Sequence, residues 1–316
     1  MPELRKDYIL DRYVIISTER SKRPHEFKQP VKRVKKKVDY FARGNEKLTP
    51  PEIGRIEGTK KGEWKMRWFP NKFPAVKTEG NSAIRTDNEF YTYADAFGYH
   101  EIIVETPTNK QLWDLKEEDI KEVLHIYAAR IKELSNKKGV KYVAVFKNHG
   151  EKGGTSIVHS HSQIIAYAIV PNYVKDKIEA CKHYGGDPYG KIIENEKNSD
   201  RRCFENEHFV AFAPYASRFN FEIAVFPKRY IERMEELSDK EYSDLAEIMK
   251  KILLKLKELN APYNYYVHYA PEGENLRLHI EVTPRLATWA GFELSTETVI
   301  NSVMPEDAAR FYRGEE

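Results

Sequence analysis

The sequence predicts an α+β fold, in which a mainly antiparallel sheet carries packed helices and one structural unit occurs twice. Strand-like runs dominate, single amphipathic helices separate them, and the order of these segments repeats along the 316 residues. Antiparallel hairpins and single helices dominate, which favours this class over a parallel nucleotide-binding sheet. No Gly-x-Gly-x-x-Gly or P-loop sequence is present, so the two commonest phosphate-binding loops are absent. A hydrophobic fraction of 41% is enough for a core, so disorder is not expected.

The first copy of the unit begins with a strand-like run at 101–104 and continues into a helix that opens near Glu117. Acidic residues in the first turn suit the positive end of the helix dipole. Three-and-four spacing predicts one buried face for this helix, formed by Ile120, Val123, Leu124, Tyr127, Ile131 and Leu134. An aromatic strand at 140–146, a Gly-containing turn and a histidine-bearing strand at 157–165 complete the copy.

The second copy repeats this order, starting with a strand-like run at 222–225. Its helix opens at Ser238, which can cap the first turn, while Glu241 can reach back to complete a capping box. The apolar face is again at helical spacing, with Leu245, Ile248, Met249, Ile252, Leu253 and Leu256. Strands are expected at 263–269 and 276–282.

Nearly equal spacing supports a duplication. Glu101 and His159 are 58 positions apart, and Glu222 and His279 are 57 apart. A Gly-Gly-Asp-Pro turn at 185–188, followed by a polar stretch, is typical of a break between copies. The expected domains are an N-terminal one over residues 1–190 and a C-terminal one over residues 191–316.

Composition points to a cytoplasmic protein. The net charge of +3 gives no field that calls for nucleic acid or a membrane, and the basic run at 32–37 is best interpreted as a solvated loop. Cys181 and Cys203 cannot form a disulfide framework, which favours a reduced intracellular compartment. No stretch approaches the roughly 18 apolar residues of a membrane helix. The charged N-terminus is unlike a signal peptide.

The histidine-bearing strand of the first copy contains His159-Ser160-His161-Ser162-Gln163. Because alternate side chains of a strand point to the same side, His159, His161 and Gln163 are expected to share one face. A neutral imidazole is a good nucleophile at phosphorus, and a nearby amide can donate to a charged phosphoryl oxygen. The loop at 148–156 supplies backbone amides and hydroxyls suited to phosphate. Taken alone, such a histidine pair also fits a metal site or structural histidines.

In its context, this motif resembles the histidine-triad superfamily. More closely, the chain is similar to the galactose-1-phosphate uridylyltransferase family, which is built from two histidine-triad-like halves. Blocks at 13–25, 44–52, 69–74 and 283–293 resemble family segments, so the resemblance extends from about residue 4 to about residue 310. The resemblance implies a fold of duplicated histidine-triad-like domains and a homodimer.

The resemblance also implies roles for individual residues. His161 would be the catalytic nucleophile, and Gln163 would bind the transferring phosphoryl group. The other positions expected to bind substrate are Arg20, Arg23, Asn71, Phe73, Asn148, Ser156 and His159. Trp289, Phe292 and Glu293 lie in a segment expected to reach the nucleotide of the partner subunit.

The implied activity is a ping-pong nucleotidyl transfer, in which UDP-glucose and galactose 1-phosphate give glucose 1-phosphate and UDP-galactose through a uridylyl-histidine. One alternative is a nucleoside-diphosphate-sugar phosphorylase, which combines ADP- or UDP-glucose with inorganic phosphate. A rival of another class is an inactive nucleotide-binding protein. A simple histidine-triad hydrolase is a further alternative, and the sequence leaves the base, the sugar and the acceptor open.

Metal content is expected to differ from that of many relatives. These hold a structural zinc with a Cys-x-x-Cys pair, a later histidine and the first histidine of the triad, but here Asp39 and Ala42 replace the cysteines. Because the stretch 105–110 lacks the third ligand, we expect no zinc and a buried, hydrogen-bonded His159. The candidate metal set of the C-terminal half is His268, His279 and Glu281, with Asp176 and Glu179 nearby. Histidines satisfied by hydrogen bonds in a packed sheet are the alternative.

Overall fold

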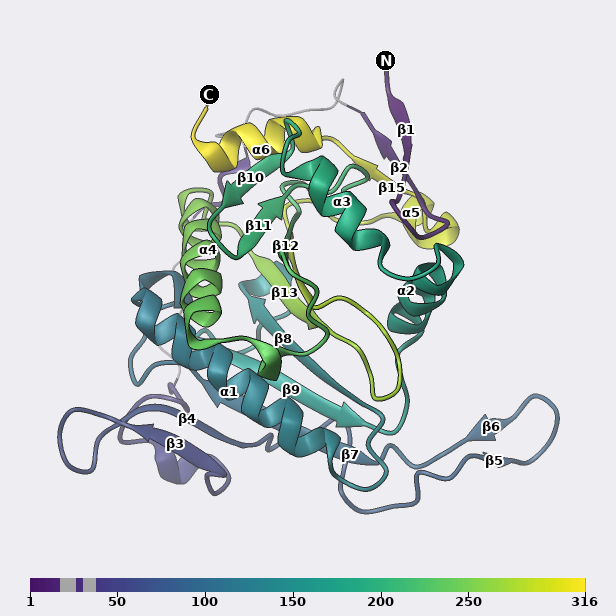
Figure 1. The fold of residues 1–316 in the computed structure, drawn as a ribbon. Coiled ribbons are helices and arrows are strands. Elements are labelled where there is room, and N and C mark those ends of the chain that lie inside the picture. The colour runs from purple at the N-terminus through teal and green to yellow at the C-terminus, as the bar shows by residue number, and fades with distance from the viewer. Residues whose placement is uncertain (18–26, 31–37, 316) are drawn as a thin grey trace.

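A computed structural model describes residues 1–17, 27–30 and 38–315 (Figure 1). Five strands come from the first part of the chain: β3 (Gly54–Glu57), β4 (Trp64–Pro70), β7 (Gly98–Val104), β8 (Tyr142–His149) and β9 (His161–Tyr167). Five follow later: β10 (Arg202–Glu205), β11 (Phe209–Phe212), β12 (Ile223–Pro227), β13 (Tyr263–His268) and β14 (His279–Pro284). Within the described residues these ten strands form one sheet, and every neighbouring pair is antiparallel. The predicted α+β class is confirmed.

The strand order reads the same from both edges. It runs β10-β11-β12-β14-β13 and then β8-β9-β7-β4-β3, so each strand of one set has a counterpart in the other. The two sets meet where β8 pairs with β13, with Phe146 opposite Tyr266. This symmetry is what a duplicated unit produces, as the sequence predicts. The division at residues 190 and 191 falls within a helix and stays a prediction, because one sheet spans both sets.

The two predicted long helices are α1 (Glu117–Ser135) and α4 (Asp239–Glu258), and they pack against each other (Figure 1). The start of α4 agrees with the predicted capping box: Glu241 N–H donates to Ser238 Oγ, and Ser238 N–H donates to a Glu241 carboxylate oxygen. Each helix buries the face that its spacing predicts. The helices therefore cover one side of the sheet, where Tyr127 of α1 forms a hydrogen bond with Ser162. Because side chains of a strand alternate, His161 and Gln163 face the other side.

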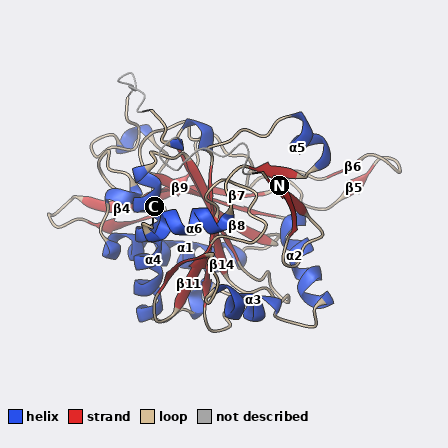
Figure 2. Ribbon diagram, turned by 90° about the horizontal axis from the view of Figure 1, so that it is seen from above, coloured by secondary structure: helices blue, strands red, loops and turns tan. Residues whose placement is uncertain are grey.

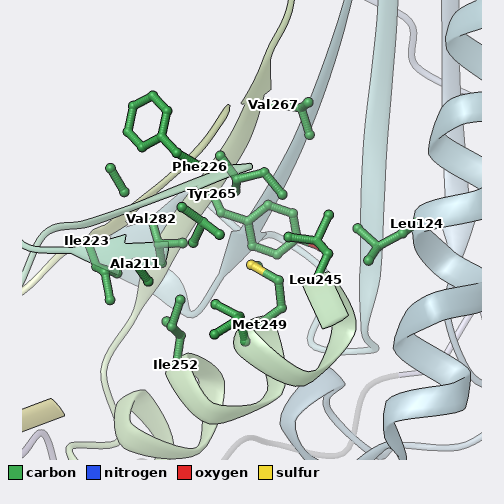
Figure 3. Close-up of a cluster of buried hydrophobic side chains, with 14 of the residues drawn as sticks. Leu124, Ala211, Ile223, Phe226, Leu245, Met249, Ile252, Tyr265, Val267 and Val282 are labelled. Carbon is green, nitrogen blue, oxygen red and sulfur yellow. The ribbon is translucent and has the colours of Figure 1, made fainter. Parts of the chain in front are cut away.

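Side chains of α4 meet the second set of strands in the core (Figure 3). Leu245, Met249 and Ile252 point towards Tyr265 and Val282, and all five side chains are buried. Burying one such side chain contributes roughly 1.5–3 kcal/mol relative to leaving it exposed. Most buried apolar residues of both halves belong to one continuous cluster, so the halves share a core.

The remaining elements lie outside the ten-stranded sheet and the helices α1 and α4. A second sheet contains β1 (Glu3–Lys6), β2 (Tyr13–Ile16) and β15 (Val299–Asn301). The helices are α2 (Asn172–His183), α3 (Pro188–Glu196), α5 (Gly291–Thr296) and α6 (Pro305–Arg313), with short 3-10 turns η3 (Glu46–Leu48), η4 (Leu112–Asp114), η5 (Glu151–Gly153) and η6 (Met234–Glu236). The hairpin of β5 (Arg85–Thr86) and β6 (Thr92–Tyr93) projects from the body in both views (Figures 1 and 2). Among the described residues, no helix combines the length and apolarity needed to cross a membrane.

Both histidine-bearing strands begin later than predicted. The strand expected at 157–165 starts at His161, and the one expected at 276–282 starts at His279 and ends at Pro284. The residues before His161 instead form turns that follow the Gly-rich loop. His159 is thus outside the strand, and the alternation argument applies only to His161 and Gln163.

Candidate active site

A pocket of about 410 Å³ lies over the first set of strands, and it contains His161 and Gln163. Its lining residues are Tyr40, Phe41, Leu48, Thr49, Pro50, Phe69, Asn71, Lys72, Phe73, Ile102, Ser156, Ile157, His161 and Gln163. The pocket is large enough for a small-molecule ligand and mostly apolar, as such sites usually are. The predicted residues Asn71, Phe73 and Ser156 are thereby brought together with His161 and Gln163.

The protonation of His161 is set by its surroundings. Its Nδ1 lies 2.8 Å from the carbonyl oxygen of His159, which can only accept, so Nδ1 carries the ring proton and Nε2 keeps a lone pair. Burial lowers the pKa of His161 to about 4, because the hydrogen bond to His159 offsets only part of the cost of burying a charge. The Phe41 ring and the imidazole pack edge to face, with ring centres 5.2 Å apart. His161 is therefore a neutral, oriented imidazole at neutral pH.

A histidine that the sequence did not single out orients Gln163. The Ala75 N–H donates to His100 Nδ1 at 3.0 Å, so the ring proton of His100 is on Nε2. This Nε2 lies 3.0 Å from Gln163 Oε1 and donates to it. The amide nitrogen of Gln163 remains as a donor beside His161. The side-chain nitrogen of Asn71 lies 3.1 Å from the same His100 nitrogen; with the proton on Nε2 both atoms are donors, so this is a contact and not a hydrogen bond.

A fully buried ion pair lies behind the strand that carries His161. Lys147 Nζ is 2.6 Å from Glu105 Oε2, and the side chains are 1% and 0% exposed. Lys147 also donates to Ser160 Oγ and to the carbonyl oxygen of His161, both at 3.0 Å. Burial opposes ionisation of Glu105, but Lys147 and the hydroxyls of Ser160 and Ser162 outweigh it and lower the pKa of this carboxyl. The network fixes β9 from the side opposite the pocket.

His159 does not share the pocket with His161, contrary to the prediction from strand alternation. It is buried, its Nδ1 lies 2.8 Å from Asp39 Oδ2, and its Nε2 lies 2.7 Å from the carbonyl oxygen of Thr106. Each ring nitrogen thus already faces an oxygen acceptor of the protein, and Asp39 and Ala42 stand where relatives have the two zinc-binding cysteines. The residues at this position therefore do not fit the zinc site of relatives. The expected burial and hydrogen bonding of His159 are confirmed.

Other predicted residues lie away from the pocket. The side chain of Asn148 on β8 accepts a hydrogen bond from Asn264, at 2.8 Å, and does not line the pocket. Trp289 stacks on Phe219 with ring centres 5.0 Å apart, while Phe292 and Glu293 belong to α5. The placement of Trp289, Phe292 and Glu293 in a partner's site stays a prediction. Arg20 and Arg23 lie outside the described residues.

The candidate metal set of the C-terminal half is also brought together. Ligand atoms of His268, His279 and Glu281 lie within 4.8 Å of one another, and all three residues are buried. The neighbours Asp176 and Glu179 are not part of the cluster, because they form exposed ion pairs with Arg12 and Lys182.

Sequence reasoning missed His100, Lys147, Glu105 and Lys177. Charged residues inside apolar runs were the available signal. Lys147 lies within β8, and Glu105 directly follows β7. Lys177 occupies the buried face of α2 together with Val174, Ile178 and Cys181. A charged side chain at such a position needs a partner, which is a usable prediction.

Comparisons with known proteins identify the family to which this chain is similar. A family model described as galactose-1-phosphate uridyl transferase, N-terminal domain, matches residues 1–171, and one described as a domain of unknown function matches residues 108–310. The ADP-glucose phosphorylase of Arabidopsis thaliana is 33% identical over 99% of this chain and 92% of its own. The galactose-1-phosphate uridylyltransferase of Thermotoga maritima is 28% identical over 99% of this chain and 98% of its own.

Solved structures of similar fold include proteins with the same kinds of name. The crystal structure of an ADP-glucose phosphorylase from Arabidopsis thaliana with bound ADP-glucose has a TM-score of 0.83 and 31% identity, and the match covers 99% of both chains. A uridylyltransferase structure has a TM-score of 0.76 and 28% identity, over 100% of this chain and 98% of the other.

Proposed function

Because the chain belongs to the galactose-1-phosphate uridylyltransferase family, we propose that this enzyme is a nucleoside-diphosphate-sugar phosphorylase. It converts ADP-glucose and inorganic phosphate into ADP and glucose 1-phosphate through a nucleotidyl group carried on His161. One observation supports the covalent step above the others: His161 lines a pocket of about 410 Å³ with Nδ1 committed to a backbone carbonyl, so that Nε2 is a nucleophile of fixed direction.

In the first step, His161 Nε2 attacks the α-phosphorus of the nucleotide sugar. The new N–P bond forms as the bond to the bridging oxygen breaks, and that oxygen leaves with glucose 1-phosphate. In the second step, an oxygen of inorganic phosphate attacks the same phosphorus. The N–P bond breaks, ADP forms and neutral His161 returns. The two steps share one transition-state geometry, so a single set of residues serves both.

Gln163 stabilises the charge that develops on the non-bridging phosphoryl oxygens. Because His100 donates to its Oε1, the amide of Gln163 keeps its nitrogen for this role without reorganising during the reaction. Removing a comparable donor from an active site costs on the order of 10²–10³ in kcat. Arg20 and Arg23 are proposed to bind the phosphates on the evidence of their match to family positions, since charge-assisted bonds suit phosphate oxygens.

Adenine and phosphate are chosen over uracil and hexose 1-phosphate because of the relatives. The phosphorylase relative is more similar to this chain than the Thermotoga maritima uridylyltransferase, at 33% against 28% identity, and the phosphorylase structure with bound ADP-glucose has the higher TM-score. The pocket walls formed by Tyr40, Leu48 and Pro50 suit a stacked base without distinguishing one base from another.

A UDP-glucose:galactose-1-phosphate uridylyltransferase is the second candidate. The family model described as galactose-1-phosphate uridyl transferase, N-terminal domain, favours it, because this model matches the segment that holds His161 and Gln163. The proposed nucleophile and the proposed role of Gln163 are the same for both candidates. Only the base and the acceptor differ.

The test uses ADP-glucose and UDP-glucose, each labelled in the α-phosphate, with inorganic phosphate or galactose 1-phosphate as acceptor. We expect labelled protein with ADP-glucose alone and release of labelled ADP when phosphate is added. His161→Ala should form no adduct, while His183→Ala, an exposed histidine on α2, should behave as the wild type. Transfer to galactose 1-phosphate from UDP-glucose alone would favour the second candidate. An absence of adduct with both nucleotide sugars would refute both.

A further inference from the structure

A cluster of buried polar side chains lies in the C-terminal half, away from the proposed active site. His268 is on β13, His279 and Glu281 are on β14, and their metal-binding atoms lie within 4.8 Å of one another. Two imidazoles and a carboxylate at this spacing form a set that could hold a divalent cation. Whether a metal fits is decided by what else reaches the same atoms.

Lys177 on helix α2 contacts two of these metal-binding atoms. Its Nζ lies 2.8 Å from His279 Nε2 and forms an ion pair with Glu281 Oε1. The Lys177 side chain is 4% exposed and the Glu281 side chain 11%, so water screens this pair little. The ring of Tyr173, one turn earlier on α2, lies 4.8 Å from the same ammonium. The ammonium is thus enclosed by the groups that would otherwise ligate a metal.

The ring proton of His279 determines what its Nε2 can do. His279 Nδ1 lies 2.8 Å from the carbonyl oxygen of Arg277, which can only accept, so the proton is on Nδ1. The lone pair on Nε2 therefore accepts a hydrogen bond from Lys177. A zinc ion would need that same lone pair at about 2.0–2.1 Å, which leaves no room for an ammonium 2.8 Å away. A metal and Lys177 exclude each other.

We propose that Lys177 is an internal cation that takes the place of a metal ion in the cluster of His268, His279 and Glu281. It joins α2, which follows the first set of strands, to β14 of the second set, and it does so without a metal. This inference does not depend on the proposed reaction. It concerns how the C-terminal half is held together.

His268 supports the proposal from a second direction. Both of its ring nitrogens are buried without a hydrogen-bond partner, and Nε2 lies 3.6 Å from Glu281 Oε2, beyond hydrogen-bonding distance. An unpaired imidazole beside Glu281 is a ligand that the ammonium of Lys177 does not use. Replacing Lys177 by a carboxylate would supply a fourth ligand and remove the competing charge, so the cluster should then bind metal.

The experiment measures bound metal and thermal stability in the full-length protein. Lys177→Glu, Lys177→Met and the double variant Lys177→Glu/His268→Ala are purified with Zn²⁺ present, then desalted for elemental analysis. Lys175→Glu makes the same chemical change on the exposed face of α2 and serves as the matched control. Melting temperatures are compared before and after treatment with EDTA.

We expect wild type and Lys175→Glu to carry no stoichiometric zinc and to keep their melting temperatures in EDTA. Lys177→Glu should bind about one zinc per chain and melt at a lower temperature once EDTA removes it. The double variant should lose that zinc. Lys177→Met fills a similar volume without charge, so it should melt below the wild type. Stoichiometric zinc in the wild type, no zinc in Lys177→Glu, or zinc retained by the double variant would each overturn the proposal.

Discussion

Replacing Lys147 by Met should destabilise the protein by about 3–5 kcal/mol, the usual cost of leaving a buried charge without its partner. The side chains of Lys147 and Glu105 are 1% and 0% exposed, so water cannot compensate Glu105 when the ammonium is removed. Methionine keeps most of the volume, which separates loss of charge from loss of packing. The free energy of unfolding is measured by urea titration, followed by far-UV circular dichroism.

A second change makes the reasoning sharper. Glu105→Gln removes the carboxylate charge and keeps an oxygen that can accept from the hydroxyls of Ser160 and Ser162, which both donate to Glu105. The double variant Lys147→Met/Glu105→Gln should therefore recover about 2 kcal/mol or more relative to the sum of the single changes. Lys197→Met, which removes an exposed ion pair with Glu194, is the control and should leave the urea midpoint unchanged.

The pH dependence of Lys147→Met gives an independent check. In the wild type the pKa of Glu105 is lowered, so its stabilising contribution is present above its unfolded pKa of 4.5 and is lost as the pH falls through the lower folded value. Without Lys147, burial is the largest influence on Glu105, and the hydroxyls of Ser160 and Ser162 offset it only in part, so the pKa of Glu105 should rise. The folded variant should then bind a proton at a higher pH than the unfolded chain does. The difference in unfolding free energy between the wild type and Lys147→Met should therefore decrease as the pH falls from 8 to 5. A deficit below about 1 kcal/mol, or one that does not change with pH, would refute the reasoning.

Three further predictions concern the proposed active site and its neighbour. The pKa of His161 is lowered from 6.5 to about 4, so between these pH values the second ring proton binds only to the unfolded chain. The wild type should therefore lose up to about 3 kcal/mol of stability as the pH falls from 6.5 to 4. Over the same range the urea midpoint of His161→Asn should fall less than that of the wild type. His100→Phe should lower kcat about tenfold with little change in KM, since one hydrogen bond that orients Gln163 is lost. His100→Gln should keep part of the wild-type kcat. An equal loss of kcat in both variants would contradict the role of His100 in orienting Gln163. Asp39→Ala should lower the unfolding free energy by about 1–3 kcal/mol, because His159 loses its carboxylate partner. EDTA should leave the melting temperature of the wild type unchanged. A lower melting temperature in EDTA would indicate a bound metal.

The parts of the fold that depend on periodicity could be predicted from the sequence. The face of α4 and its capping box follow from spacing and from residue types within one helix turn, because both are local. The duplication follows from nearly equal spacing of like segments, and the order of the strands in the sheet repeats it. Strand ends could not be predicted as well, since the start of β9 at His161 is set by the Gly-rich loop before it.

The part of the candidate site that lies within one short motif could be predicted: His161 and Gln163 are two residues apart, and both line the pocket. What the sequence could not reveal are the partners across the sheet. His100 meets Gln163 because β7 pairs with β9, and Lys177 meets Glu281 because a helix folds back across 104 positions of chain. Such contacts depend on tertiary packing, and the residue types alone give no distance.

The pairing of β8 with β13 in the middle of the sheet has a consequence for any attempt to cut the chain in two. A fragment ending after α3 would leave the outer hydrogen-bonding edge of β8 without a neighbour, although this strand packs at the centre of the intact molecule. Bare edges of this kind recruit other strands, so the isolated fragment should self-associate. Co-expressing the remaining C-terminal fragment should suppress this self-association, because its strand β13 can then pair with β8.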